Sequence, residues 1–381
     1  MKGTLLIFFA NVIYSIPTVI LVVMASHMGK PSSVVELGLA ISVCAPAQLL
    51  LSMQNNVSII SGKLSLVDAM RTRINLLPVF LLIGLFGALF FSSILFLCFF
   101  LYRGSEFLYE VEMVECFRVG DYLDALYRTL QRAIFFLALS TSVLMLHGSL
   151  ELSIAVAGIP MAIFTMARCL RKYAGRGVVV FNFALGGAAF IASLIVNLPR
   201  YYVVAADSLY AAFYSNMMTI ILGGGVLYGA LNNYMFARLC VQGKRGVQRF
   251  MNYSLLLFFF GIFLSFFILE STSIQSWIVS LFLGYKYIEL SGGVMGFALL
   301  YLVLYFHSVL NYVFVYLDDA PIYLGSLGVY GVLMALLIYH NLSSALLGQK
   351  LVWFVCAVGV LYGIVCYFYL SFRLSVRRPG V

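Results

Sequence analysis

The sequence is short of charged residues: Asp, Glu, Lys and Arg together make up 10% of its 381 residues. A water-soluble domain usually carries about 25% of such residues, because its surface must be hydrated. This chain is instead 63% hydrophobic, with a mean hydropathy of +1.04. Its composition therefore excludes a soluble globule and predicts a polytopic membrane protein.

Cysteine pairs with the spacing of metal ligands are missing. The seven cysteines lie in or beside apolar runs, and no C-x-x-C pair occurs among them. Structural zinc sites and disulfide frameworks depend on closely spaced or paired cysteines. The sequence therefore predicts neither a metal site nor a disulfide framework, and no cofactor is expected.

A single basic patch is also missing, although the formal net charge is +9. Domains that bind nucleic acids gather Lys and Arg on one face. Here the basic residues fall in small groups between apolar runs, which is typical of the cytoplasmic loops of a membrane protein. Membrane lipids are therefore expected as partners, and nucleic acid is not.

Apolar runs of spanning length make up most of the chain and predict an all-α protein with about twelve transmembrane helices. The first run is too long for the apolar region of a cleaved signal peptide, so we interpret it as an uncleaved span. The connections are short, so a large extramembrane catalytic domain is not expected and the protein is predicted not to be an enzyme. The predicted helices are 3–28, 34–59, 74–98, 99–117, 133–147, 152–168, 177–198, 209–237, 250–270, 291–316, 321–339 and 351–372.

The fourth predicted helix, 99–117, is the most highly charged, because it contains Arg103 and four glutamates. With twelve spans and a cytoplasmic N-terminus, most of the 23 lysines and arginines fall in cytoplasmic loops. Without the fourth span most of them would lie outside, against the positive-inside rule. The count therefore favours a fourth span, with both termini in the cytoplasm.

A charge at the centre of a spanning helix costs about 2.5–3.5 kcal/mol, so the fourth helix is expected to face an internal cavity. Helical spacing places Arg103, Glu106 and Glu110 on one face, whereas Glu112 and Glu115 point elsewhere. Glu106 and Glu110 are candidates for carrying a coupling ion, H⁺ or Na⁺. The alternative is a pair that is neutralised by Arg103 or packed against the segment that follows.

That segment, RVGDYLDALYRTLQRA at 118–133, has one polar and one apolar helical face. The polar face includes Arg128 and Arg132. The pattern predicts an amphipathic cytoplasmic helix at the lipid interface, with basic residues near anionic headgroups. A gate or collecting site for an anionic substrate is the alternative.

Twelve spans divide into two parallel six-helix bundles, 1–172 and 173–381, around a central cavity. Weak internal similarity supports the division, since Pro17 and Pro199 both lie late in the first helix of their half. Because proline removes a backbone donor and strains the preceding turn, both are candidate hinges.

Amide side chains gather near the cytoplasmic ends of the second and eighth helices. They are Gln54, Asn55, Asn56, Asn232 and Asn233. Amides of this kind form hydrogen bonds between membrane helices, and that is one expected role. The alternative is that they form the rim of the cavity and contact sugars, and the candidates for this role are Asn55, Asn56 and Asn232.

The segment NLPRYY, residues 197–202, places an arginine at the outer end of the seventh helix. Asn197 is positioned to bond carbonyls freed by Pro199. Arg200 has two interpretations, an anchor at the outer headgroups beside two tyrosines, or a guanidinium that faces the central opening and binds phosphate or sugar hydroxyls. Asn216 lies deeper in the next helix and is a further cavity candidate.

Three stretches carry a resemblance to a known family. They are NLPRYYVVAADSLYAAFYSNMMTIILGGGVLYGALNNYMFARLCVQGKRGVQRF, LYRGSEFLYEVEMVECFRVGDYLDALYRTLQRA and LGYKYIELSGGVMGFALLYLVLYFHSVL. They resemble the seventh and eighth helices, the fourth helix with its basic elbow, and the entry to the tenth helix of the O-antigen and polysaccharide flippases. These are oligosaccharide translocases of the multidrug/oligosaccharidyl-lipid/polysaccharide exporter (MOP) superfamily. Glu106 stands in the place of the family's acidic residue, whereas GKPSSVVELG departs from its glycine-rich outer turn.

The resemblance implies a flippase that moves a polyprenyl-pyrophosphate-linked oligosaccharide, such as an O-antigen repeat unit, across the bacterial cytoplasmic (inner) membrane by alternating access. It further implies association with polysaccharide polymerase and chain-length proteins. Two other functions compete. One is a membrane-embedded polysaccharide polymerase or glycosyltransferase, which is expected to have catalytic loops outside. The other is a multidrug or cation exporter of the same superfamily, which an anionic cavity without basic residues would favour.

Overall fold

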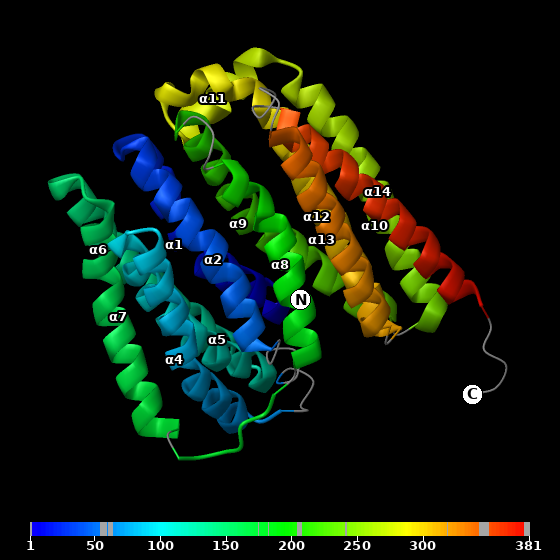
Figure 1. Cartoon of the computed structure of the whole chain (residues 1–381). Helices are drawn as coiled ribbons and strands as arrows, with labels where there is room; N and C mark the ends of the chain where they lie inside the picture. The colour runs from blue at the N-terminus through cyan, green and yellow to red at the C-terminus, as the bar shows by residue number, and fades with distance from the viewer. Residues whose placement is uncertain are drawn as a thin grey trace. The chain divides into compact units, whose positions relative to one another are not determined.

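The computed structural model describes residues 2–53, 59, 64–173, 175–181, 183–203, 208–240, 242–317, 319–342 and 350–376. Within these residues every regular element is a helix (Figure 1). Nine helices in the described part are long and apolar enough to cross a membrane. The prediction of an all-α polytopic membrane protein is confirmed.

Twelve described helices have between 21 and 33 residues, as many as the sequence predicts. Long helices are the expected result of long apolar runs, because a helix satisfies its backbone hydrogen bonds internally. They are α1 (Lys2–Met28), α2 (Pro31–Ser52), α4 (Leu66–Phe90), α5 (Ile94–Val119), α6 (Tyr122–His147), α7 (Leu150–Tyr173), α8 (Phe183–Val203), α9 (Ser208–Cys240), α10 (Gly243–Leu269), α12 (Val294–Tyr316), α13 (Ala320–Leu342) and α14 (Lys350–Ser375).

Helix α4 begins and ends eight residues before the predicted 74–98, which is a correction. Ser65 caps its N-terminus, since the Ser65 hydroxyl accepts a hydrogen bond from the Asp68 backbone N–H at 3.1 Å. The helix ends because Ser92 adopts a left-handed conformation, with φ of 50°. These local signals outweigh the hydropathy of 91–98, of which residues 94–98 belong to the next helix.

The amphipathic cytoplasmic helix predicted at 118–133 is not a separate element, and this is a second correction. Gly120, with φ of 85°, ends α5, and Asp121 caps α6, which then continues without a break to His147. Arg128 is exposed and pairs with Asp124 one turn away, at 2.7 Å. The amphipathic segment is therefore the first half of a long helix.

The segment after α7 is attached to the N-terminal end of α4. The backbone N–H of Val178 donates to the Asp68 carboxylate at 2.7 Å, and that of Val180 donates to the Thr72 hydroxyl at 3.0 Å. Asp68 thus serves both the first turn of α4 and the connection between the sixth and seventh long helices.

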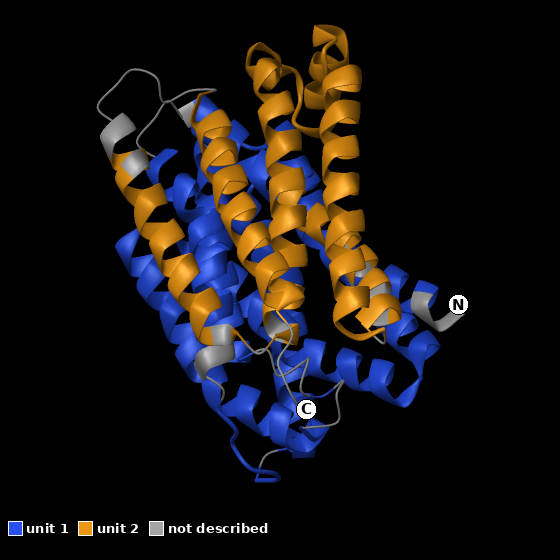
Figure 2. Ribbon diagram, turned by 90° about the vertical axis from the view of Figure 1, so that its right-hand side faces the viewer, with its two compact units in different colours: residues 1–219 blue, residues 220–381 orange. Residues whose placement is uncertain are grey.

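The chain forms two compact units, residues 1–219 and 220–381, so the division falls inside α9 (Figure 2). Helix α8 packs against α2 within the first unit. The division into two six-helix bundles at 172 and 173, around a central cavity, stays a prediction.

Small residues allow close helix packing in both units. In the first, Gly158 of α7 lies against Tyr102 of α5, where an added Cβ would come within 2.8 Å of the Tyr102 Cβ. In the second, a Cβ on Gly359 of α14 would come within 2.7 Å of Val303 of α12. Without side chains at these glycines, neighbouring backbones approach closely, as is common between membrane helices.

The segment 271–290, predicted as a connection, contains helical structure. Helix α11 (Thr272–Phe282) and the 3-10 helix η1 (Tyr285–Gly293) occupy most of it. The sequence prediction missed these elements because they are shorter than a membrane span.

We predict that Gly158→Ala destabilises the protein by about 1–3 kcal/mol, because the new methyl group forces α5 and α7 apart. Gly187→Ala is the matched control, since no atom lies within 4 Å of the position that its Cβ would occupy. The measurement is the midpoint of thermal unfolding of the purified protein. Equal midpoints for the two variants would contradict the packing described here.

Candidate functional site

Two carboxylates on α5 are paired with arginines from other helices. Glu106 accepts a hydrogen bond from Arg132 of α6 at 3.1 Å, and Glu110 accepts one from Arg73 of α4 at 2.8 Å. The Arg73 side chain is fully buried and also donates to the Phe107 carbonyl oxygen at 2.6 Å. Both candidate ion-coupling carboxylates therefore already have a cationic partner.

The other two glutamates of α5 are paired as well. Glu112, which is buried, bonds Arg168 of α7, and Glu115 pairs with Arg118 one turn along the same helix. Helix α5 is thus linked by charge to α4, α6 and α7. Of the predicted alternative, neutralisation by Arg103 is not what the structure shows, because the carboxylates have other arginines as partners. Glu106 does contact the segment that follows α5, since Arg132 belongs to residues 118–133.

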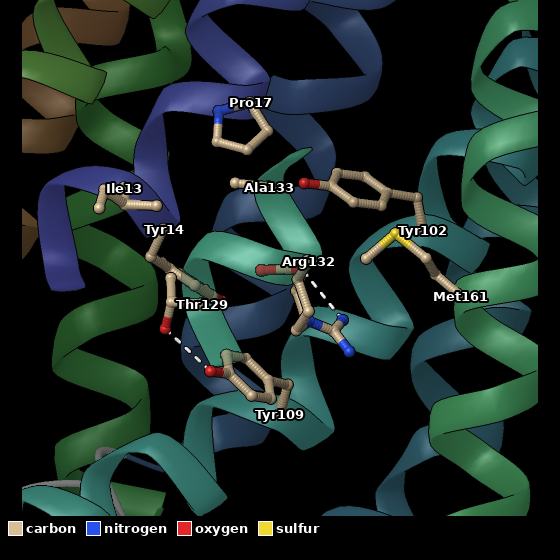
Figure 3. A pocket seen from close by; sticks show the side chains of 10 residues that line it. Ile13, Tyr14, Pro17, Tyr102, Tyr109, Thr129, Arg132, Ala133 and Met161 are labelled. Atoms are coloured by element: carbon tan, nitrogen blue, oxygen red, sulfur yellow. Dashed lines mark hydrogen bonds and ion pairs between the residues drawn. The ribbon is translucent and has the colours of Figure 1, made fainter. Parts of the chain in front are cut away.

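A recess next to the Glu106–Arg132 pair lies between α1, α5, α6 and α7 (Figure 3). It measures about 220 Å³, including space that is open to the outside, and has room for roughly one water molecule. The Pro17 ring removes one helical hydrogen bond from the carbonyl of Ile13 at the recess wall. The lining residues are Ile13, Tyr14, Pro17, Tyr102, Glu106, Tyr109, Thr129, Arg132, Ala133 and Met161.

Arg132 is held from several sides. Its guanidinium lies 4.4 Å from the centre of the Tyr109 ring, and it donates to the hydroxyls of Ser105 and Thr165 at 3.0 and 2.9 Å. The Tyr109 hydroxyl is bonded to Thr129 at 2.8 Å (Figure 3). With Glu106 and Arg132 paired, the recess has no net charge from these two groups.

A second polar cluster, which we call the Arg200 cluster, joins the end of α8 to the start of α9. The guanidinium of Arg200 donates to the Asn197 side-chain oxygen at 3.2 Å, to the Ser215 carbonyl oxygen at 3.0 Å and to the Thr219 hydroxyl at 2.8 Å. Arg200 is 1% exposed. It is therefore enclosed within the first unit, at neutral oxygen acceptors.

The neighbours of this cluster tie it to α1 and α2. Asn216 donates to the Ser26 hydroxyl at 2.5 Å, and Tyr201 donates to the Ser42 carbonyl oxygen at 2.7 Å. Gly38 of α2 gives Ser215 room, because a Cβ there would lie 2.5 Å from the Ser215 Cβ. Asn197 bonds the Ser193 carbonyl oxygen at 2.8 Å, one helical turn back. The structure thus brings three predicted residues together: Asn197, Arg200 and Asn216.

Arg103 and Arg200 differ from the other inward-facing arginines of the first unit. Arg103 donates to the Gln48 side-chain oxygen at 2.6 Å. Neither takes part in a salt bridge among the described residues, which exclude Asp207. A guanidinium held by neutral acceptors retains its full charge for an incoming anion.

The remaining predicted residues lie elsewhere. Asn232 belongs to the second unit and donates to the Ser308 hydroxyl of α12 at 3.2 Å, which is a helix-to-helix contact. Asn55 and Asn56 lie outside the described residues. Arg128 is on the exposed face of α6 and contributes nothing to the recess.

Three residues of the polar interior were not among those predicted from the sequence: Arg73, Arg168 and Gln48. Arg73 was counted in a cytoplasmic loop because the third helix was expected to begin at 74. The Ser65-x-x-Asp68 spacing is a helix-start signature that would have placed Arg73 inside the helix. No comparable signal marks Arg168 or Gln48.

We predict that Glu106→Leu or Arg132→Leu alone lowers the free energy of unfolding by about 3–5 kcal/mol, because each leaves a buried charge without its partner. The double variant is expected to lose less than the sum of the two. The unfolding midpoints of all three variants give the coupling energy between Glu106 and Arg132. Arg118→Ala is the exposed control, which is expected to change stability by less than about 1 kcal/mol. Additive losses would contradict a structural ion pair.

No protein-family model matches the sequence, and no curated protein matches it. Solved structures do. A MOP-superfamily transporter from Pyrococcus furiosus, described as having a binding pocket of reversed polarity that suggests a different function, aligns with a TM-score of 0.59 at 13% identity over 98% of both chains.

Two further similar structures are multidrug resistance transporters of the MATE family of that superfamily. The outward-facing one has a TM-score of 0.58 at 12% identity over 98% of both chains. The inward-facing one has a TM-score of 0.55 at 13% identity over 98% of this chain and 94% of the other. These similarities extend over nearly the whole sequence and concern its architecture. The chain has the fold of the MOP-superfamily transporters.

Proposed function

We propose that the protein is a flippase that moves a polyprenyl-pyrophosphate-linked oligosaccharide across a bacterial cytoplasmic membrane by alternating access. The MOP-transporter fold supports movement of a substrate through a multi-pass protein. The lipid tail of such a substrate stays in the bilayer, while its diphosphate and sugars cross along a polar path. That path has to supply cations or donors, because a bare diphosphate is excluded from hydrocarbon.

The Arg200 cluster carries this proposal. Its guanidinium is already desolvated and is held by three neutral oxygens that a phosphate could replace. Charge-assisted bonds from arginine to phosphate are stronger than bonds to neutral acceptors. When the contacts between α8 and α9 open, Arg200 exchanges its internal acceptors for the anionic headgroup. The enclosed state is then the resting state of the site.

Multidrug or cation export is the second candidate, because two of the similar structures are MATE transporters. A cation exporter needs an anionic recess. Among the described residues that line the recess of the first unit, Glu106 is the only carboxylate, and it is paired with Arg132. Arg103 and Arg200, which are held by neutral oxygens rather than by carboxylates, favour an anionic substrate instead. A polymerase or glycosyltransferase is the least favoured, since the fold is that of transporters.

Coupling to an ion gradient is part of the proposal. Glu106 lines the recess, and Glu110 lies one turn further along α5. Binding of H⁺ or Na⁺ at either carboxylate would have to release its arginine. Pro17, beside the recess, and Pro199, beside Arg200, are the proposed hinges. Release of an arginine next to a hinge would connect ion binding to helix movement.

The flippase function also places the protein in a pathway. Polysaccharide polymerase and chain-length proteins would act on the same lipid-linked units on the outer side of the membrane.

Both termini are proposed to lie in the cytoplasm.

We predict that Arg200→Ala reduces flipping of a polyprenyl-pyrophosphate oligosaccharide about tenfold or more, because a charge-assisted hydrogen bond contributes about 1.5–3 kcal/mol. Arg200→Lys is expected to keep part of the activity. The measurement is the cytoplasmic accumulation of lipid-linked repeat units in cells that lack the native gene and carry each variant, at equal protein abundance.

Arg118→Ala is the control, since this arginine is exposed and is paired with Glu115 one turn away. Full complementation by Arg200→Ala would contradict the assignment of Arg200 to the substrate. Increased drug susceptibility of the deletion strain without accumulation of lipid-linked sugars would favour the multidrug exporter.

We further predict that Glu106→Gln removes the dependence of transport on the coupling gradient, because the amide carries no charge to exchange for an ion. Flipping is measured in vesicles with imposed proton or sodium gradients, with Glu115→Gln as the control at an exposed pair. A gradient response that persists in Glu106→Gln and disappears in Glu110→Gln would move the coupling role to Glu110.

A further inference from the structure

Helix α11 has an unusual distribution of side chains around its axis. With about 100° per residue, its side chains fall into three sectors. The first contains Gln275, Val279 and Leu283, which directly follows the helix, and all three are buried in the protein. The second is rich in hydroxyl groups, from Ser273, Ser276 and Ser280.

The third sector of α11 is apolar and faces outward. Its residues recur at the spacing i, i+3, i+4, i+7 and i+8: Ile274, Trp277, Ile278, Leu281 and Phe282. Trp277 is 61% exposed, and Leu281 is 50% exposed. A helix that packs on protein in water turns its apolar stripe inward. In α11 the apolar stripe faces outward instead, and the rest of the protein does not cover it.

The direction of α11 separates it from the spans. In Figure 1 it runs across the ends of α10 and α12 rather than alongside them. It has 11 residues, which is too short to cross a bilayer. If α10 and α12 span the membrane, α11 lies close to the plane of the bilayer, at the level where these helices end.

We propose that α11 is an interfacial helix that inserts its outward apolar sector at the boundary between lipid headgroups and acyl chains. Tryptophan, tyrosine and lysine are enriched at this level of the bilayer. Trp277 lies in the sector itself, and the exposed Tyr285 and Lys286 follow it at the start of η1. Of the hydroxyl sector, Ser276 bonds the Ser291 hydroxyl of η1 at 3.3 Å, and Ser273 and Ser280 are left to face water.

Lipid is the occupant that the neighbouring surface favours. The outward face of α10, which leads directly into α11, is strongly aromatic and exposed, with Phe259, Phe260, Phe263 and Phe267. In a membrane protein such a face contacts acyl chains. The apolar sector of α11 extends this surface beyond the end of α10, so the bilayer that covers α10 also reaches α11.

The protein has two tryptophans, so Trp353→Phe leaves Trp277 as its single fluorophore. The full-length variant is placed in nanodiscs of phosphatidylcholine and phosphatidylglycerol with bromine atoms near either the carbonyl or the methyl end of the acyl chains. We expect the shallow bromines to quench Trp277 about twofold more strongly than the deep ones, because interfacial helices insert only about 5–10 Å. Aqueous iodide is expected to quench it weakly.

Two adjacent positions provide matched probes. In a background with Trp277→Phe and Trp353→Phe, Leu281→Trp tests the apolar sector and Ser280→Trp tests the hydroxyl sector. Bromine is expected to quench the first and iodide the second. Size-exclusion chromatography verifies that each variant is folded.

Three results would overturn the proposal. Strong iodide quenching of Trp277 without bromine quenching would place α11 in water. Absence of both would mean that protein, including a second copy of the chain, covers the sector. Stronger quenching by the deep bromines would indicate a re-entrant segment rather than an interfacial helix.

Discussion

Carboxylates inside a membrane protein have to be paired, because an isolated charge loses its hydration in a low-dielectric environment. Helix α5 carries this constraint for the whole first unit. Its glutamates at 106, 110 and 112 each hold an arginine from a different helix, α6, α4 and α7 respectively. The position of α5 among its neighbours is thereby fixed by charge as well as by close contacts such as that of Gly158 with Tyr102.

The arginines of the first unit fall into two groups that differ in what they offer a substrate. Those paired with α5 are already neutralised, and their role is to hold the bundle together. Arg103 and Arg200 are held by neutral amide, hydroxyl or carbonyl oxygens instead. Exchanging a neutral acceptor for a phosphate strengthens the bond, whereas exchanging a carboxylate for a phosphate gains little. The difference in partners, rather than the number of arginines, supports an anionic substrate.

The second unit is built with other interactions. Its described part has one salt bridge, between Arg373 and Asp319 near the end of α14. Its interior relies on aromatic and small residues: the rings of Tyr330 and Tyr362 stack at 4.5 Å, and His307 contacts both and bonds the Gly359 carbonyl oxygen at 2.8 Å. The mid-span histidine therefore has the packing role expected of most buried histidines. Charge and its pairing are concentrated in the first unit.

The sequence by itself determined that the chain is a bundle of about twelve long helices, because continuous apolar runs in lipid leave the backbone no other way to satisfy its hydrogen bonds. It also identified the charged fourth helix and the polar group of Asn197, Arg200 and Asn216. Hydropathy did not predict three features of the helices: the start of α4, the continuity of α6 and the existence of α11. They depend on helix caps, turns and short periodic patterns, which a hydropathy profile does not detect. Only the tertiary structure decided the partners of the charges. Arg73 and Glu110, like Arg168 and Glu112, lie on different helices, and the periodicity of one helix gives the direction of a side chain but not the neighbour that it meets.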